Sequence, residues 1–226
     1  MKILVLGKGK TGSIVAETAR LRGHNVTSIG SEENPSAAFL TQEKLNDTDV
    51  VIDFTTPTAV IENISACTRA RKNMVVGTTG WYGELEYVRQ LADTNRIGFL
   101  YGSNFSVGVN VFFEVARAAS TALKLGYTAK IMERHHEQKK DAPSGTAVSI
   151  QKILAATGHQ PEITSIREGE TVGTHVMLFD GPHDTMMLVH DAKSRQGFAE
   201  GAVRAAEWIY GKHGFFEFHD IFRELS

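Results

Sequence analysis

The sequence predicts an α/β protein: a Rossmann-like, doubly wound parallel sheet followed by a second, smaller α+β domain. Three observations support this fold class. Strands and helices alternate through the first half, a glycine-rich loop joins the first strand to the first helix, and the second half contains hairpin-like strands. A chain of 226 residues is long enough for one large domain or two small ones.

The first half contains short apolar segments rich in β-forming residues, and each of them is a predicted strand. Between these segments, apolar residues recur at helical spacing and predict helices. The predicted strands are residues 2–6, 25–29, 49–54, 74–76 and 97–101, and the predicted helices are residues 13–22, 58–71 and 84–93.

The loop between the first strand and the first helix, residues 7–12, has the sequence G-K-G-K-T-G. A Gly-x-Gly-x-x-Gly pattern in this context is the fingerprint of dinucleotide binding. Gly7 and Gly9 would let the backbone approach a pyrophosphate, and Gly12 would let the helix pack on the strand. The loop therefore predicts a nucleotide cofactor, and the alternative is a tight turn without a ligand.

One element of this fingerprint is missing. In NAD-binding folds the second strand usually ends in an acidic residue that binds the ribose hydroxyls, but here G-S-E-E, residues 30–33, follows that strand. Lys8 or Lys10 would suit a 2′-phosphate, although either lysine is equally well explained as a solvated charge. Both NADH and NADPH therefore stay open.

Small and hydroxylated residues follow three further predicted strands. Ligands bind beyond the carboxyl ends of the strands in an open parallel sheet, so this recurrence favours a ligand crevice. Each residue alone is also explained as part of a turn or cap. These residues are Thr55, Thr56, Thr78, Thr79, Ser103 and Asn104.

The second half has a mixed pattern that predicts a separate domain, with a boundary near Asn104 placed from pattern alone. The predicted helices are residues 107–123, 147–156 and 199–210, and the predicted strands are residues 128–134, 172–179 and 185–190.

Residues 133–146, E-R-H-H-E-Q-K-K-D-A-P-S-G-T, concentrate groups that carry chemistry. Histidine titrates near neutrality and therefore suits proton transfer. Lys139 adds a charge and a second proton, and residues 144–146 are typical of a helix start, where free N–H groups attract anions. The segment predicts a pocket for a small anion that receives a proton.

The two histidines have two other interpretations. One is that His135 and His136 form an ordinary surface pair. Adjacent residues on a strand point to opposite faces, so both histidines can enter one pocket only if the strand ends here, and we expect it to end. A metal site of these histidines with Glu137 and Asp141 lacks the H-E-x-x-H spacing and any cysteine, so no metal is expected.

Composition narrows the class of protein. The net charge of −2 gives no reason to expect nucleic acid or an anionic membrane as a partner. No apolar stretch approaches the roughly 20 residues of a membrane span, and Lys8 and Lys10 interrupt the first apolar run, unlike a secretory signal. Cys67 is the only cysteine, which excludes an intrachain disulfide. We expect a cytoplasmic protein.

Five motifs now occur together in order. They are the glycine loop, D-F-T-T-P at residues 53–57, G-T-T-G at residues 77–80, N-F-S-V-G-V-N at residues 104–110, and the segment at residues 133–146, which matches E-x-H-H-x-x-K-x-D-A-P-S-G-T. In these motifs, over nearly its whole length, the chain resembles the dihydrodipicolinate (4-hydroxy-tetrahydrodipicolinate) reductase family of bacterial lysine and diaminopimelate synthesis.

The resemblance implies an NADPH- or NADH-dependent oxidoreductase that reduces this cyclic imine to tetrahydrodipicolinate. It gives catalytic roles to His135, as acid/base, and to Lys139, as proton donor. The substrate-binding residues that it implies are His136, Gly145 and Thr146. The cofactor-binding residues that it implies are Gly7, Lys8, Gly9, Lys10, Thr11, Gly12, Gly77, Thr78, Thr79, Gly102, Ser103, Asn104 and Phe105.

The resemblance also implies a domain organisation. Residues 1–104, joined by residues 196–226, would bind the dinucleotide, and residues 105–195 would bind the substrate and build a homotetramer. The chain departs from the family pattern in a glycine loop one residue shorter, in the missing acidic residue and in its short length. Arg195 matches a family arginine near the substrate pocket, or forms a surface salt bridge.

Two competing functions remain at this level. A sister dehydrogenase acting on homoserine or aspartate would share the architecture, but the His-His-x-x-Lys pattern argues against it. A nucleotide sensor without catalysis would usually have lost the groups at His135 and Lys139, which are intact here.

Overall fold

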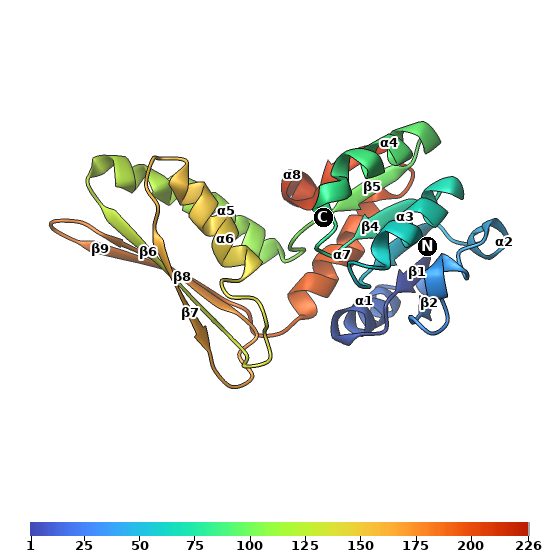
Figure 1. The fold of residues 1–226 in the computed structure, drawn as a ribbon, viewed down its shortest axis with the longest axis horizontal. Helices are drawn as coiled ribbons and strands as arrows, with labels where there is room; N and C mark the ends of the chain where they lie inside the picture. Colours follow the sequence, from blue (N-terminus) through green and yellow to red (C-terminus); the bar gives the residue numbers. More distant parts are fainter. Residues whose placement is uncertain (226) are drawn as a thin grey trace. The chain divides into compact units, whose positions relative to one another are not determined.

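The computed structural model describes residues 1–225, which form two compact units (Figure 1). The first unit contains Met1–Ser106 together with the chain from Gln196 onward, and the second contains Val107–Arg195. The first unit holds a parallel sheet with helices, and the second holds a smaller mixed sheet, so the predicted fold class is confirmed.

The sheet of the first unit has six strands in the order β10-β5-β4-β3-β1-β2, and every neighbouring pair is parallel. The strand order reverses at β1, beside β3, which is where open sheets of this kind bind ligands. The strands are β1 (Lys2–Leu6), β2 (Asn25–Ile29), β3 (Val50–Asp53), β4 (Asn73–Val76), β5 (Gly98–Tyr101) and β10 (Gly214–Glu217).

Helices cover both faces of this sheet, and for that reason its central strands are continuous apolar runs. Ile3 and Val5 of β1 pack with α1 and α7, whereas Leu4 and Leu6 pack with α3 and α4. The helices of the unit are α1 (Lys10–Leu21), α2 (Gln42–Leu45), α3 (Val60–Arg69), α4 (Leu85–Asn95), α7 (Gln196–Ile209) and α8 (Phe218–Ile221).

The second unit has a four-stranded sheet in the order β7-β6-β8-β9. β6 is parallel to β7 and antiparallel to β8, which forms a hairpin with β9. α5 and α6 pack on one face, around Ile131, Met177 and Phe179. The elements are α5 (Val107–Ala119), β6 (Thr128–His135), α6 (Gly145–Ala155), β7 (Glu162–Arg167), β8 (Thr174–Asp180) and β9 (Thr185–Asp191).

Two edge strands and one helix start differ from the sequence expectations. β7 and β10 were not predicted, because each is an edge strand whose side chains are half exposed. α1 begins at Lys10 and so includes Gly12, because the helix starts before its apolar periodicity does. No helix among the described residues is long and apolar enough to cross a membrane.

Candidate active site

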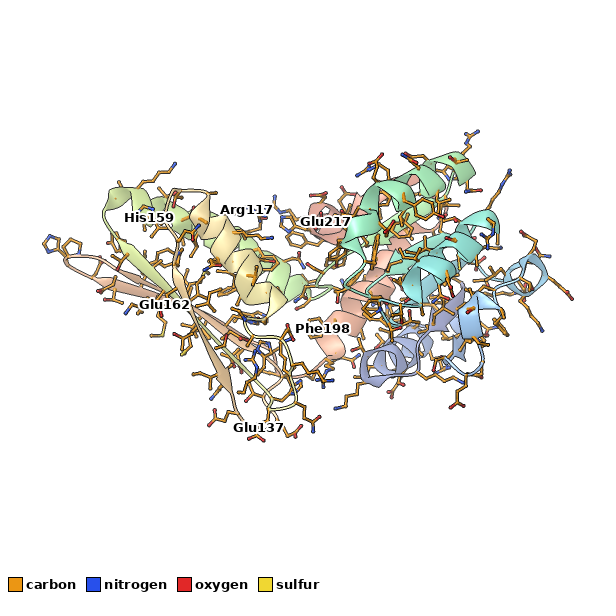
Figure 2. All side chains as sticks on the ribbon, viewed as in Figure 1. Arg117, Glu137, His159, Glu162, Phe198 and Glu217 are labelled. Atoms are coloured by element: carbon orange, nitrogen blue, oxygen red, sulfur yellow. The ribbon has the colours of Figure 1, made fainter. Side chains whose placement is uncertain are left out.

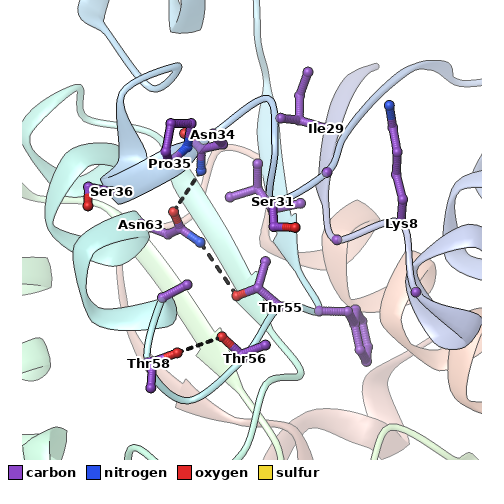
Figure 3. Close-up of a pocket in the computed structure, with 16 residues that line it drawn as sticks. Lys8, Ile29, Ser31, Asn34, Pro35, Ser36, Thr55, Thr56, Thr58 and Asn63 are labelled. Atoms are coloured by element: carbon purple, nitrogen blue, oxygen red, sulfur yellow. Dashed lines mark hydrogen bonds between the residues drawn. The ribbon is translucent and has the colours of Figure 1, made fainter.

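Two cavities open beyond the carboxyl ends of the parallel strands in the first unit. One, of about 430 Å³, lies between the glycine loop, the end of β2 and the start of α3 (Figure 3). The other, of about 280 Å³, lies between the first turn of α1 and the segments that follow β3 and β4. Gly9, Phe54 and Thr55 line both cavities. This is the place where a doubly wound sheet binds a dinucleotide.

The glycine loop has the geometry that a pyrophosphate requires. Gly7 has a φ of +101°, and a Cβ there would lie 2.2 Å from the carbonyl oxygen of Phe54. A Cβ on Gly12 would lie 2.0 Å from the carbonyl oxygen of Gly7. Gly9 is the N-cap of α1, and a Cβ there would meet nothing within 4 Å. Open space in front of free helix N–H groups fits the phosphates of a nicotinamide dinucleotide.

Asp53 joins the loops of both cavities although it is fully buried. Its Oδ1 accepts hydrogen bonds from the N–H and hydroxyl of Thr55, at 2.9 and 2.7 Å, and from the Thr78 hydroxyl at 2.7 Å. Its Oδ2 accepts one from Asn63 at 2.9 Å, and Asn63 accepts one from Asn34. Burial raises the pKa of Asp53, against the effect of these hydrogen bonds.

An acidic side chain reaches the end of β2 from the following loop, although the strand itself does not end in one. Oε2 of Glu33 accepts a hydrogen bond from the N–H of Gly30 at 2.7 Å and pairs with Nζ of Lys8 at 2.6 Å. The Lys8 and Gly30 hydrogen bonds hold the pKa of Glu33 below its ordinary value. Lys8 is therefore ion-paired at the rim of the larger cavity, whose lining includes both Lys8 and Gly30.

The remaining residues expected to bind cofactor fall into two groups. Residues 102–105 line neither cavity, and the Phe105 ring is 2% exposed, in the core against Phe54 and Phe218. The side chain of Phe105 is therefore not available to a ligand. Asn104 accepts a hydrogen bond from the N–H of Ser106. The residues that line the smaller cavity are Lys10, Thr11, Gly12, Gly77, Thr78 and Thr79.

In the second unit, Glu133 and His135 are two residues apart on β6, so their side chains lie on the same face of the strand, and both are buried. Oε2 of Glu133 contacts Nδ1 of His135 as an ion pair, although the angles are not those of a hydrogen bond. Arg167 of β7 donates from Nη1 to Oε1 of Glu133 at 2.9 Å. Burial lowers the pKa of His135, whereas the Glu133 charge opposes that shift.

His175 completes this cluster from β8, where it lies opposite Glu133 in the sheet register. Its ring meets that of His135 edge to face, with centroids 5.1 Å apart, and its Nε2 lies 3.2 Å from the hydroxyl of Ser144. Burial, with a smaller effect of His135, lowers the pKa of His175 to about 4. His175 is therefore neutral at neutral pH.

The loop after β6 brings Lys139 and the start of α6 to the same cluster. Nζ of Lys139 lies 2.8 Å from Oδ1 of Asp141, and Arg167 donates to the Asp141 carbonyl at 2.5 Å. Ser144 caps α6 by accepting a hydrogen bond from the N–H of Ala147. Gly145 and Thr146 follow as the first helical residues, and a Cβ on Gly145 would meet nothing within 4 Å. Space is thus open beside the first residue of α6.

β6 ends at His135, as the histidine pair predicted. His136 lies just outside the strand, and its Nε2 is 3.4 Å from Nη2 of Arg195. The contact places Arg195 beside the histidine pair. Glu137 is exposed and lies in the turn that follows β6 (Figure 2).

The metal alternative gathers different residues from those considered in the sequence. Among the described residues, the nitrogen and carboxylate atoms that lie within 4.8 Å of one another belong to Glu133, His135 and His175. The Arg167 guanidinium already balances the charge of Glu133. We therefore interpret this cluster as a proton-transfer group and not as a metal site.

Sequence reasoning gave no role to Glu133, Arg167 or His175. The period of two along β6 was a signal for Glu133, because it places that carboxylate on the same face as His135. Nothing comparable pointed to Arg167 or His175, since their contacts depend on the register of β6 with β7 and β8.

Comparisons with known proteins agree over both units. The profile described as "Dihydrodipicolinate reductase, N-terminus" matches residues 1–105, and "Dihydrodipicolinate reductase, C-terminus" matches residues 108–222. The 4-hydroxy-tetrahydrodipicolinate reductase of Christiangramia forsetii is 36% identical, covering 100% of this chain and 99% of its own. That of Cupriavidus metallidurans is 32% identical, covering 98% of each chain.

A solved structure supports the fold. Dipicolinate-bound dihydrodipicolinate reductase from Paenisporosarcina sp. TG-14 superposes with a TM-score of 0.77 at 24% identity, covering 98% of this chain and 99% of that chain. The diaminopimelate dehydrogenase of C. glutamicum gives a lower TM-score of 0.54 at 11% identity, covering 97% of this chain and 93% of that chain.

Proposed function

Since the chain belongs to the dihydrodipicolinate reductase family, we propose that it reduces 4-hydroxy-tetrahydrodipicolinate, or the dihydrodipicolinate formed by its dehydration, to tetrahydrodipicolinate. This is a reduction step of lysine and diaminopimelate biosynthesis, and the chain is an oxidoreductase. The observation that carries the assignment of residues is the cluster of His135, Lys139 and the start of α6 in the second unit.

The reduction needs a reduced nicotinamide, which supplies a hydride to the ring when it is bound. The glycine loop and the first turn of α1 would hold the pyrophosphate, and residues 77–79 would line the nicotinamide side. Glu33 would accept hydrogen bonds from the ribose hydroxyls of NADH, and Lys8 would form an ion pair with the 2′-phosphate of NADPH. We therefore propose that both nucleotides serve.

His135 would provide the proton that the reduced ring requires. Burial lowers the pKa of this ring, and contact with the Glu133 carboxylate opposes that effect and so supports the protonated form that can donate. Lys139 would promote loss of the ring hydroxyl and balance the negative charge of the substrate.

The two carboxylates of the substrate would be held by different elements. The N–H groups of Gly145 and Thr146, with the Thr146 hydroxyl, would bind one carboxylate at the positive end of α6. His136 and Arg195 offer a second set of donors 3.4 Å apart, which suits the other carboxylate.

A homotetramer is part of the proposal. The face of the mixed sheet opposite α5 and α6 exposes apolar side chains, among them Met132 at 40%, Met187 at 64% and Val189 at 53%. An apolar sheet face of this kind favours pairing with a second copy of the chain. Light scattering would test the assembly, and a monomer at micromolar concentration would contradict it. A cytoplasmic location belongs to the same proposal, because reduced nicotinamide is regenerated there.

The decisive experiment follows oxidation of NADH and of NADPH while a dihydrodipicolinate synthase makes the substrate from pyruvate and aspartate semialdehyde. Oxidation that depends on this substrate would support the reductase, and the two rates would give the cofactor preference. Nucleotide binding without oxidation would favour a sensor. Oxidation of homoserine or aspartate, without imine reduction, would favour a sister dehydrogenase.

The variant His135→Gln separates catalysis from binding. Loss of the acid should lower kcat by about 10²- to 10⁴-fold, the usual contribution of a positioned acid. Nucleotide affinity, measured by fluorescence titration, should stay unchanged. An equal loss of turnover and nucleotide binding would make His135 a structural residue.

A further inference from the structure

A buried carboxylate with no role in the proposed chemistry lies beside the proposed acid. Glu133 is 0% exposed, and an ionised carboxylate in such a place is costly unless it is paired and hydrogen-bonded. Two groups pair with it, one through each oxygen. Arg167 binds Oε1 at 2.9 Å, and His135 contacts Oε2 through Nδ1.

Arg167 connects this carboxylate to the loop that carries the other proposed substrate groups. While Nη1 holds Glu133, Nη2 donates to the carbonyl of Asp141 at 2.5 Å. The same Asp141 pairs with Lys139 through its side chain. One guanidinium therefore fixes the Glu133 carboxylate and the loop relative to each other.

The opposite edge of the His135 ring is packed differently. A Cβ on Gly173 would lie 2.9 Å from Nε2 of His135 and 3.2 Å from its Cδ2. Any side chain at Gly173 would press on this edge of the ring, and glycine avoids that contact. The His135 ring thus has the Glu133 carboxylate at Nδ1, and residue 173 places no side chain against Nε2.

We infer that Glu133 is the positioning residue of His135: its Oε2, in contact with Nδ1, favours a proton on that nitrogen, orients the ring and leaves Nε2 to exchange a proton with the substrate. The inference rests on the proposed role of His135 as acid. No bond is made or broken by Glu133, whose contribution is orientation and charge.

Among the charged groups around His135, Glu133 has the opposite effect on the pKa of the ring to Lys139 and Arg167. The groups that face the ring are Glu133 on the same strand, Arg167 on β7, His175 on β8 and Lys139 on the following loop. Burial, Lys139 and Arg167 lower the pKa of His135, and Glu133 raises it. Removal of the carboxylate should therefore make the ring lose its proton at lower pH.

The first test uses the wild-type protein and needs no turnover. With ¹⁵N-labelled histidine, NMR reports which ring nitrogen carries the proton in the neutral form. The chain has nine histidines, so the His135 signals are assigned by their loss in His135→Gln. We expect the Nδ1–H form, facing Glu133. The Nε2–H form would overturn the inference.

The second test is Glu133→Gln, which keeps the shape and removes the charge. We expect kcat to fall roughly 10- to 100-fold, part of the contribution of a positioned acid, with KM nearly unchanged. The basic limb of the kcat profile should move to lower pH, together with the NMR titration of His135. A folded variant with a wild-type profile would refute the positioning role.

The chain offers a matched control in its first unit. Glu207 also lies between a histidine and an arginine, 2.7 Å from Nε2 of His24 and 2.6 Å from Nη2 of Arg22. Glu207→Gln should leave kcat and its pH profile unchanged, and an equal shift in this variant would overturn the inference by showing a general electrostatic effect.

The outcomes separate the two proposals. If Glu133→Gln does not fold, the wild-type tautomer still decides the inference. If the wild-type enzyme does not oxidise nicotinamide with the imine, the proposed function fails while the tautomer measurement remains valid.

Discussion

Replacing Asp53 by alanine should destabilise the protein and loosen the loops that line both cavities. Asp53 is 0% exposed, and its removal deprives the hydroxyls of Thr55 and Thr78 and the amide of Asn63 of their acceptor. The N–H of Thr55 keeps the Thr78 hydroxyl at 2.8 Å. Each orphaned buried donor costs about 1–3 kcal/mol. Because hydroxyls can turn to other acceptors, we expect a total loss of about 3–5 kcal/mol, toward the lower end of three such costs.

Urea unfolding measures this loss, and nucleotide titration measures its effect on the cavities. Asp53→Asn should cost less, since it retains the shape and one acceptor oxygen. Asp47→Asn is the control, because Asp47 is 82% exposed in a surface pair with Lys2 and should change stability by less than about 0.5 kcal/mol. If Asp53→Ala unfolds within about 1 kcal/mol of wild type and binds nucleotide normally, the reasoning is refuted.

Three further predictions concern the substrate, the cofactor and pH. Thr146→Val should raise KM about tenfold through loss of a hydrogen bond to a charged group, with kcat retained; an unchanged KM in steady-state kinetics would remove Thr146 from the pocket. Glu33→Gln should favour NADPH over NADH about tenfold in kcat/KM, because Lys8 loses its anionic partner; a constant ratio would exclude Glu33 from cofactor recognition. His175 has a folded pKa of about 4, below its unfolded value, so the stability it contributes is complete above about pH 6.5 and is lost as pH falls toward 4. Urea unfolding at two pH values should show this loss in wild type, with a weaker slope in His175→Gln; equal slopes would contradict it.

The fold was largely predictable where burial is strong. Central strands such as β3, with every residue buried, are apolar runs that stand out in any sequence. β7, E-I-T-S-I-R, is an edge strand whose residues are exposed or half buried, so its pattern resembles a loop. Edge strands are specified by the neighbour that they pair with, and that neighbour is distant in the sequence.

The candidate site divides in the same way. His135, Lys139 and residues 144–146 lie within one short segment, and local chemistry was enough to select them. Arg167 contacts Glu133 across 34 residues of sequence, and this contact exists only in one register of β6 and β7. A one-residue slip would turn the guanidinium to the other face of the sheet. Such partners therefore require the structure.

The discontinuity of the first unit has a consequence for how the chain can be divided. α7 and β10 follow the second unit in sequence, yet they supply part of the core and one edge of the parallel sheet. A fragment that stops before Gln196 would bare the apolar face that α7 covers. The two crossings nevertheless lie side by side, because a Cβ on Gly197 would lie 3.7 Å from Oγ of Ser106. Residues 107–195 are therefore an insertion that leaves and rejoins the first unit at one point. A short glycine linker in their place should leave a self-contained nucleotide-binding protein.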